Sequence, residues 1–356
     1  MAFFYHHPLL LIGAGPVGLT LALQLTRRGI PVRIVEKEEE RPALSKAIGI
    51  NPRTLELLEE SGVTARILAE GVRLKSIRLH QRGQVRVGDF SGVDHRYNFM
   101  TALPQNETER LLEEALAAQG VQVERGTTLT GFREEKDGVW VQLQGRMSEE
   151  IKTPLLCGTD GAKSRVRQKA GIGFPGSDDP DSWSLADFET DTALPAAINL
   201  LLDKEGPMLV IPLTEGVYRV ASLLPDALER LPPDIPVRKV VFASRFRVSY
   251  RVAETLVRGR VVLAGDAAHV HAPVGARGMN LGIEDACTLA EVISRGGSLE
   301  AWGRVRRRKA QGVVRQTKIL ATVLDGGNFF TRLVRGLVFR HFERVAPLVM
   351  RRMLDV

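Results

Sequence analysis

The feature that most constrains the fold of this chain is a glycine-rich turn, GAGPVG, at residues 13–18. An apolar run from Leu9 to Ile12 precedes the turn and predicts a buried strand. Residues 19–28 then carry apolar side chains at helical spacing, and residues 32–35 predict a second strand that ends beside Glu36. A strand, a glycine turn, a helix, a strand and an acid in this order are typical of a dinucleotide-binding βαβ unit.

Each part of this unit has a physical role. Gly13 permits the tight turn, Gly15 lets the backbone approach a pyrophosphate, and Gly18 lets the helix pack closely on the strand. The helix N-terminus offers N–H groups and a positive dipole end to phosphates. Glu36 is expected to accept both hydroxyls of an adenosine ribose. The cofactor contacts expected here are Gly13, Gly15, Pro16, Val17, Gly18, Glu36 and Lys37. The motif alone does not separate FAD from NAD, and a glycine turn without a ligand is the structural alternative.

A second motif begins where an apolar strand predicted over residues 154–158 ends. Asp160 and Gly161 follow that strand, and Arg165 lies on a short predicted helix. Gly161 suits a turn that needs a positive φ, and Arg165 is expected to reach a phosphate. The alternative is a strand-to-helix turn that carries its own cap.

A third motif, GDAAH at residues 265–269, follows the apolar run at 261–264. The buried strand predicted there would bring Asp266 to the end of the sheet, where it can accept a hydrogen bond from a ribitol hydroxyl. The glycine-dense loop at 275–278 precedes a helix. Its backbone N–H groups are expected to stabilise the anion of a reduced cofactor ring.

The three motifs, in this order, resemble those of the class A flavoprotein monooxygenases, which include para-hydroxybenzoate hydroxylase and the ubiquinone-biosynthesis hydroxylases. The resemblance covers about residues 8–310 and is most specific in GDAAH and the PxGxxGMN pattern at 273–280. It implies that the bound dinucleotide is FAD. Beyond the first turn, the residues it assigns to cofactor binding are Lys46, Gln105, Asp160, Gly161, Arg165, Gly265, Asp266, Pro273, Gly275, Ala276, Arg277, Gly278, Met279 and Asn280.

Two positions depart from the family pattern. Lys46 stands where the family often has an arginine after serine, and Ala276-Arg277 replaces the more usual Gly-Gln. Arg277 would place a fixed positive charge near the flavin pyrimidine edge or at the ring entrance.

The predicted fold class is α/β, with a Rossmann-like FAD-binding domain interleaved with a mixed β-sheet substrate domain and followed by a helical C-terminus. The FAD-binding domain is expected to comprise residues 1–75, 100–175 and 256–320, the substrate domain 76–99 and 176–255, and the C-terminal helices 321–356. The strands expected in the substrate domain are 77–87, 97–100, 197–202, 208–212 and 217–223.

The resemblance implies an FAD-dependent monooxygenase, an oxidoreductase that consumes NAD(P)H and O₂. It would hydroxylate an electron-rich aromatic or quinone-like substrate through a flavin C4a-hydroperoxide. Because no second GxGxxG occurs, NAD(P)H is expected to bind transiently. The alternative is an FAD-dependent reductase of the geranylgeranyl-reductase kind, without oxygen transfer.

No catalytic residue is assigned from the sequence. His269 is expected to be structural, and His271 and Arg251 are weaker candidates for a base. The remaining candidates on substrate-domain strands are Tyr218, Arg219 and Tyr250, for which packing is favoured over substrate contact. No metal site is expected from the histidines, and Cys157 and Cys287 indicate neither a metal site nor a disulfide.

The net charge of +7 is unevenly distributed, because residues 301–356 hold 13 Lys and Arg against three acids, a balance of +10. The positive charge therefore belongs to this segment, and no nucleic-acid partner is predicted. Apolar residues from Phe330 to Val349 recur at helical spacing, and Pro347 is expected to break or kink that helix. Packing of this stripe over the enzyme body is favoured, with contact to an anionic membrane as the alternative.

The first dozen residues are expected to form a strand rather than a signal peptide, and no transmembrane helix is predicted. The expected location is cytoplasmic, with peripheral membrane contact as the alternative. The sequence predicts no oligomeric state.

Overall fold

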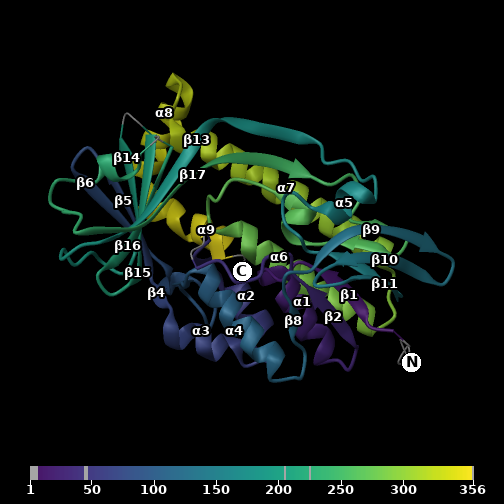
Figure 1. The fold of residues 1–356 in the computed structure, drawn as a ribbon. Helices are drawn as coiled ribbons and strands as arrows, with labels where there is room; N and C mark the ends of the chain where they lie inside the picture. The colour runs from purple at the N-terminus through teal and green to yellow at the C-terminus, as the bar shows by residue number, and fades with distance from the viewer. Residues whose placement is uncertain (1–6, 44–46, 204–205, 224–225, 355–356) are drawn as a thin grey trace.

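The computed structural model describes residues 7–43, 47–203, 206–223 and 226–354. Two β-sheets lie at opposite ends of the molecule, and the long helix α7 (Leu299–Asp325) runs between them (Figure 1). The α/β fold predicted from the sequence, with a mixed second sheet and a helical C-terminus, is confirmed.

The first sheet has the strand order β18-β19-β12-β1-β2-β8. Its strands are β1 (Leu9–Ile12), β2 (Val32–Val35), β8 (Val123–Glu124), β12 (Leu156–Gly158), β18 (Val257–Arg258) and β19 (Val261–Leu263). All neighbouring strands are parallel except β18 and β19. Every residue of β1 is buried, as expected for a parallel strand covered on both faces. The helix α1 (Pro16–Thr26) packs against α4 (Gln105–Ala117) and α6 (Arg277–Ser294).

Smaller elements surround this sheet. A three-stranded antiparallel sheet holds β9 (Thr128–Glu135), β10 (Gly138–Gln144) and β11 (Ser148–Thr153), and the helix α5 (Arg165–Lys169) lies beside β9. A second small sheet holds β3 (Gly49–Ile50), β4 (Val72–Leu74) and β7 (Met100–Ala102), with α2 (Pro52–Glu59) and α3 (Val63–Glu70) nearby in the chain.

The large sheet has eight strands in the order β20-β17-β13-β16-β15-β14-β5-β6. They are β5 (Ser76–Gln81), β6 (Gln84–Asp89), β13 (Gly176–Glu189), β14 (Ile198–Asp203), β15 (Gly206–Thr214), β16 (Val217–Ser222), β17 (Lys239–Val252) and β20 (His269–Val270). The sheet is mixed, because β5 and β14 are parallel while the other neighbours are antiparallel.

Two strand predictions are wrong. The single strand expected over 77–87 is a hairpin, because Arg82 and Gly83 both adopt a positive φ and reverse the chain between β5 and β6. The strand expected over 97–100 instead begins at Met100.

The longest strand pair, β13 with β17, was not identified from the sequence. Each strand has 14 residues, and they reach from the large sheet toward the first sheet (Figure 1). Much of β17 alternates between exposed and half-buried residues, with Arg245 and Arg247 on its exposed side. A strand of this kind lacks the apolar run that marks β1.

The C-terminal helices correct a further prediction. The helical segment after α7 divides into α8 (Phe329–Arg340) and α9 (Phe342–Leu354), and the division falls at His341, while Pro347 lies inside α9. The apolar stripe expected to cover the body is largely turned outward, because Phe330, Leu333 and Leu337 are exposed. Phe342 of that stripe is buried as expected, against β6 and its surroundings, together with three residues outside the stripe: Phe339, Ala346 and Met350.

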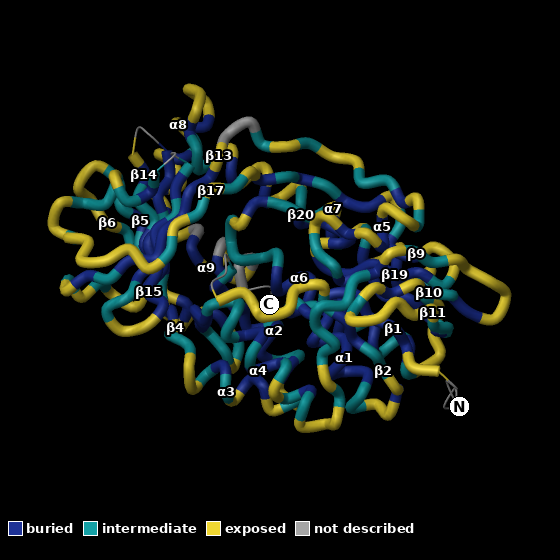
Figure 2. The backbone as a smooth tube through the Cα atoms, viewed as in Figure 1, coloured by how far each residue is buried: buried dark blue, intermediate teal, exposed yellow. Residues whose placement is uncertain are grey.

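Many of the buried residues lie in and around the two sheets (Figure 2). The largest apolar cluster surrounds the first sheet, and a second joins the large sheet to β7 and α9. Within the described ranges, no helix is long and apolar enough to cross a membrane.

Candidate active site

The glycine turn between β1 and α1 combines two close contacts with one open position. Gly13 has φ +104°, and a Cβ there would lie 2.6 Å from the Thr159 carbonyl oxygen. A Cβ at Gly18 would lie 1.9 Å from the Gly13 carbonyl oxygen. At Gly15, however, a Cβ would meet no atom of the described residues within 4 Å. Pro16 begins α1, and no side chain caps its N-terminus. The turn thus has the close packing and the open backbone that a pyrophosphate site requires.

Glu36 is fixed beside this turn at the end of β2. One carboxylate oxygen accepts a hydrogen bond from the Ala14 backbone N–H at 2.8 Å, and the other accepts one from Glu38 N–H at 3.1 Å. Each carboxylate oxygen has a second lone pair, so Glu36 retains acceptor capacity for ribose hydroxyls. The neighbouring Lys37 is exposed and pairs with Glu38 at 3.2 Å.

Gln105 begins α4, as predicted from the sequence. Its side-chain amide donates to Glu109 Oε1 at 2.8 Å, and its backbone N–H donates to the Ala47 carbonyl at 2.9 Å. Burial raises the pKa of Glu109 above its usual range, although the hydrogen bond from Gln105 opposes that shift. The sequence did not single out Glu109 as a neighbour of the site. Lys46 lies outside the described residues.

The second motif forms a turn at the end of β12. Gly161 has φ +77°, which confirms the positive φ expected there. Asp160 Oδ2 accepts from the backbone N–H groups of Arg165 at 2.7 Å and Val166 at 3.1 Å, so it caps the start of α5. Arg165 Nη1 donates to the Leu129 carbonyl of β9 at 3.4 Å. The segment is therefore a strand-to-helix turn with its own cap, as the alternative interpretation expected. Cofactor contact by Asp160, Gly161 and Arg165 stays a prediction.

Asp266 follows β19 on the short 3-10 turn formed by Gly265–Ala267. Its side chain is exposed and makes no hydrogen bond within the described part of the chain. Surrounding protein atoms nevertheless raise its pKa by desolvation, against the opposing effect of His269. Asp266 is thus a carboxylate that solvent can reach but that protein closely surrounds, which suits an acceptor for a ligand hydroxyl.

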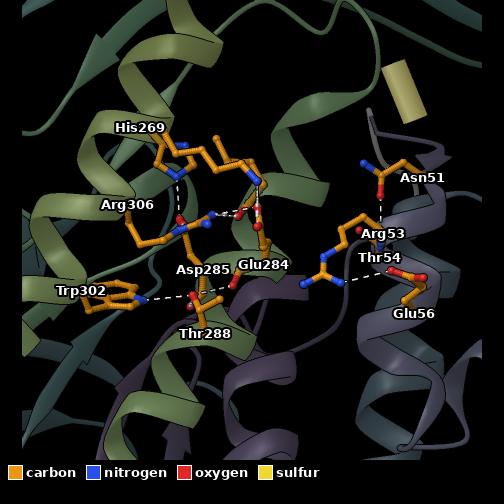
Figure 3. Close-up of polar contacts among 12 residues, drawn as sticks. Asn51, Arg53, Thr54, Glu56, His269, Glu284, Asp285, Thr288, Trp302 and Arg306 are labelled. Carbon is orange, nitrogen blue, oxygen red and sulfur yellow. Dashed lines mark hydrogen bonds and ion pairs between the residues drawn. The ribbon is translucent and has the colours of Figure 1, made fainter. Parts of the chain in front are cut away.

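A buried carboxylate, Asp285 of α6, holds the GDAAH segment in place (Figure 3). Its Oδ2 lies 2.6 Å from His269 Nε2 and accepts from the Gly265 backbone N–H at 3.2 Å. Its Oδ1 accepts from Arg306 Nε of α7 at 2.6 Å. Burial alone would raise the pKa of Asp285, but the charges and hydrogen bonds of His269 and Arg306 outweigh it and lower that pKa.

The same cluster extends along α6 and α7. Arg306 also donates to Glu284 at 3.1 Å, and Lys309 contacts both Glu284 carboxylate oxygens within 2.7 Å. Trp302 Nε1 donates to Thr288 Oγ1 at 3.0 Å (Figure 3). His269 is 1% exposed and is committed to this network, so it has no access to a substrate. Sequence reasoning missed Arg306, whose partner Asp285 is 21 residues away.

The loop from Pro273 to Asn280 is tied to β3. Asn280 accepts from the Asn51 backbone N–H at 3.0 Å and donates to the Gly49 carbonyl at 2.8 Å. Ala276 precedes α6 with φ +53°, a conformation that favours glycine, and a Cβ at Gly49 would lie 2.5 Å from the Ala276 Cβ. Ala276, which replaces a residue that is more usually glycine in the family, therefore has a strained backbone conformation.

Most of the weaker candidates have structural roles. His271 Nδ1 lies 2.9 Å from the Ala272 carbonyl, and burial lowers the pKa of His271 to about 4, so its imidazole is neutral near pH 7. Arg251 pairs with Asp178 at 2.8 Å. Tyr218 accepts from Leu194 N–H and packs on Phe188. Burial raises the pKa of Tyr250 to about 12.

Arg219 differs from these residues because it borders a cavity of about 380 Å³. Arg219 of β16 and Asp187 of β13 are each 4% exposed and form a two-point ion pair, at 2.6 and 2.7 Å. The other lining residues come from α3, from the start of α4 and from the large sheet: Glu70, Leu103, Pro104, Asn106, Glu107, Leu213, Thr214, Val217 and Val241.

Comparison with known proteins identifies this arrangement. The family model described as an FAD binding domain matches residues 6–230 and 222–317. The chain is 32% identical over 343 residues to an uncharacterized aromatic compound monooxygenase of Bacillus subtilis (strain 168), covering 88% of this chain and 68% of that protein. It is 34% identical over 304 residues to 6-methylpretetramide 4-monooxygenase of Streptomyces rimosus, covering 79% of this chain and 54% of that protein.

A solved structure of a monooxygenase is also similar to this chain. The p-nitrophenol 4-monooxygenase of Pseudomonas putida DLL-E4 superposes with a TM-score of 0.89 at 26% identity, covering 98% of this chain and 96% of that chain. The chain belongs to the class A FAD-dependent monooxygenase family. The open turn at Gly15 and the accessible carboxylate of Asp266 fit the cofactor of this family.

A pair of glycine variants separates the two roles within the turn of this monooxygenase. Gly15→Val should leave the chain folded, because the space there is open, yet it should abolish retention of FAD. Gly18→Val should destabilise the fold itself, because the side chain would meet the Gly13 carbonyl. Flavin absorbance and circular dichroism of the purified variants measure both effects. Full flavin retention by Gly15→Val would contradict the assignment.

A neutral replacement tests the buried carboxylate. Asp285→Asn should lower the free energy of unfolding at pH 7 by about 3–5 kcal/mol, because the buried Arg306 loses its counter-charge. The folded state lowers the pKa of Asp285, so its contribution is present above the ordinary carboxyl pKa and is lost as the pH falls through the lowered value. Urea unfolding should therefore show a difference that shrinks in acid. A difference that is constant with pH would be the contrary result.

Proposed function

We propose that this chain binds FAD and uses NAD(P)H and O₂ to hydroxylate an electron-rich aromatic or quinone-like compound. The observation that carries the dinucleotide-binding part of this proposal is the glycine turn, in which Gly13 and Gly18 are closely packed while Gly15 faces open space. The comparisons support a monooxygenase, since the relatives named above are monooxygenases, and they do not favour the reductase alternative.

The residues that would hold FAD come from separate segments of the chain. In this proposal Glu36 binds the adenosine ribose, the turn at Gly13–Gly18 binds the pyrophosphate, and Asp266 accepts from the ribityl chain. Gln105 and the DG turn at Asp160 lie beside these groups, and Lys37 and Lys46 remain predictions from the resemblance. Bound FAD supplies the redox chemistry, taking electrons from NAD(P)H and activating O₂.

The loop before α6 would contact the flavin ring. The segment from Pro273 to Asn280 presents backbone N–H groups near the positive end of the α6 dipole, which suits the anionic form of a reduced ring. Arg277 is the first residue of α6 and adds a fixed positive charge there. Asn280 donates to the Gly49 carbonyl and so ties the first turn of α6 to β3.

We assign the aromatic substrate to the cavity beside Arg219. Leu103, Leu213 and Val217 supply apolar wall for a ring, and the Asp187–Arg219 pair supplies a polar point for a ring substituent. The pair carries no net charge, and Glu70 and Glu107 also line the cavity, so the wall disfavours a strongly anionic ring. His271 is neutral and hydrogen-bonded to the backbone, so no base is assigned. A cytoplasmic location also remains a proposal.

Adjacent residues of β17 test this assignment. Val241 lines the cavity, whereas Val240 is not among its lining residues and is 46% exposed. Purified enzyme should oxidise NADH or NADPH faster, with O₂ uptake, in the presence of a phenol, quinolone or polyprenyl-phenol from a substrate panel. Val241→Trp should raise KM for the active compound about ten-fold or more, corresponding to roughly 1.4 kcal/mol of lost binding. Val240→Trp should leave KM unchanged.

Two results would count against the proposal. If only small dicarboxylates stimulate NAD(P)H oxidation, the substrate class is wrong. If both tryptophan variants behave like the parent enzyme, the substrate occupies a different cavity.

A further inference from the structure

The helix α8 exposes its large apolar side chains to solvent. Phe329 is 83% exposed, Phe330 70%, Leu333 50% and Leu337 49%. Positions 329, 333 and 337 are spaced by four residues, and 330 lies next to them, so these side chains share one face of the helix. Ile319 and Leu320 are also exposed on α7, which packs against α8. The α8 helix stands at the margin of the molecule (Figure 1).

Polar contacts fix this orientation. The buried face of α8 contains Thr331, Arg335 and Phe339. Arg335 donates to the backbone carbonyls of Asp203 at 3.0 Å and Leu324 at 3.2 Å, which anchors its guanidinium on the protein side. A capping box between Asn328 and Thr331 sets the start of the helix. An arginine is therefore buried while phenylalanines face outward, and turning the helix over would break these bonds.

The charge around the apolar face is positive. Arg332, Arg340 and Arg344 are exposed on α8 and α9. Two exposed acids lie near α8 and α9, and both are paired: Glu343 with Arg86 at 3.5 Å, and Asp203 with Arg230. Residues 329–354 hold six arginines against one acid, Glu343. Two copies of this segment would repel each other, so the charge disfavours a second copy as the partner.

We propose that the exposed face of α8, formed by Phe329, Phe330, Leu333 and Leu337, is a contact surface for an anionic phospholipid membrane. Aromatic and leucine side chains beside arginines are the composition of helices that lie in the membrane interface. The apolar residues would enter the headgroup–acyl boundary, and Arg332 and Arg340 would pair with lipid phosphates. This inference does not depend on the substrate proposed above.

Vesicle binding by the whole protein tests this surface. We expect it to sediment with vesicles of phosphatidylcholine and phosphatidylglycerol at low salt, and much less with phosphatidylcholine alone or at high salt. The double variant Phe330→Ser with Leu333→Ser should weaken binding about ten-fold or more. Arg340→Gln should weaken binding to the anionic vesicles and reduce its salt dependence.

A matched control variant distinguishes membrane binding through α8 from nonspecific adsorption through any exposed apolar side chain. Met147 lies between β10 and β11 and is 82% exposed, so Met147→Ser removes an exposed apolar side chain far along the chain. This variant should bind vesicles like the parent protein, and all variants should keep their FAD content. Absence of binding to anionic vesicles would overturn the proposal. So would a dimer, seen by sedimentation, that the Phe330→Ser and Leu333→Ser double variant dissociates.

Discussion

The buried carboxylate of Asp285 is the interaction on which the candidate site depends. It joins the backbone of Gly265, the ring of His269 and the guanidinium of Arg306, and so connects the end of β19, β20 and α7 to α6. A buried charge of this kind is costly unless it is fully paired. The pairing therefore determines where the segment carrying Asp266 lies relative to the loop at Ala276.

A second constraint acts at the glycine turn. Gly13 and Gly18 are required by close approach of the chain to itself, whereas Gly15 is not, because no atom of the described residues lies within 4 Å of where its Cβ would be. The place of Gly15 between β1 and α1, in a turn whose other glycines are closely packed, fits a pyrophosphate that needs the backbone bare. Glu36, held by the Ala14 and Glu38 N–H groups, stands at the same turn.

Much of the first sheet could be predicted from the sequence, because buried parallel strands such as β1 are apolar without interruption. The strand β17 could not, since its exposed arginines Arg245 and Arg247 alternate with half-buried residues. Local motifs predicted Gly161 and Gln105 correctly as a turn and a helix start. They gave no sign of Arg306, because its partner depends on how α7 packs on α6. Helical spacing likewise revealed an apolar stripe in α8 but not which face is buried, which is fixed by Arg335 and distant carbonyls.

We propose that this family member transfers oxygen from O₂ to an aromatic compound. Its most direct test is turnover of an active substrate under isotopically labelled dioxygen in ordinary water, followed by mass spectrometry of the product. We expect a hydroxylated product that carries one labelled oxygen atom, with no label when the water is labelled instead. A product without label from dioxygen, or a reduced product that forms equally well without oxygen, would contradict it.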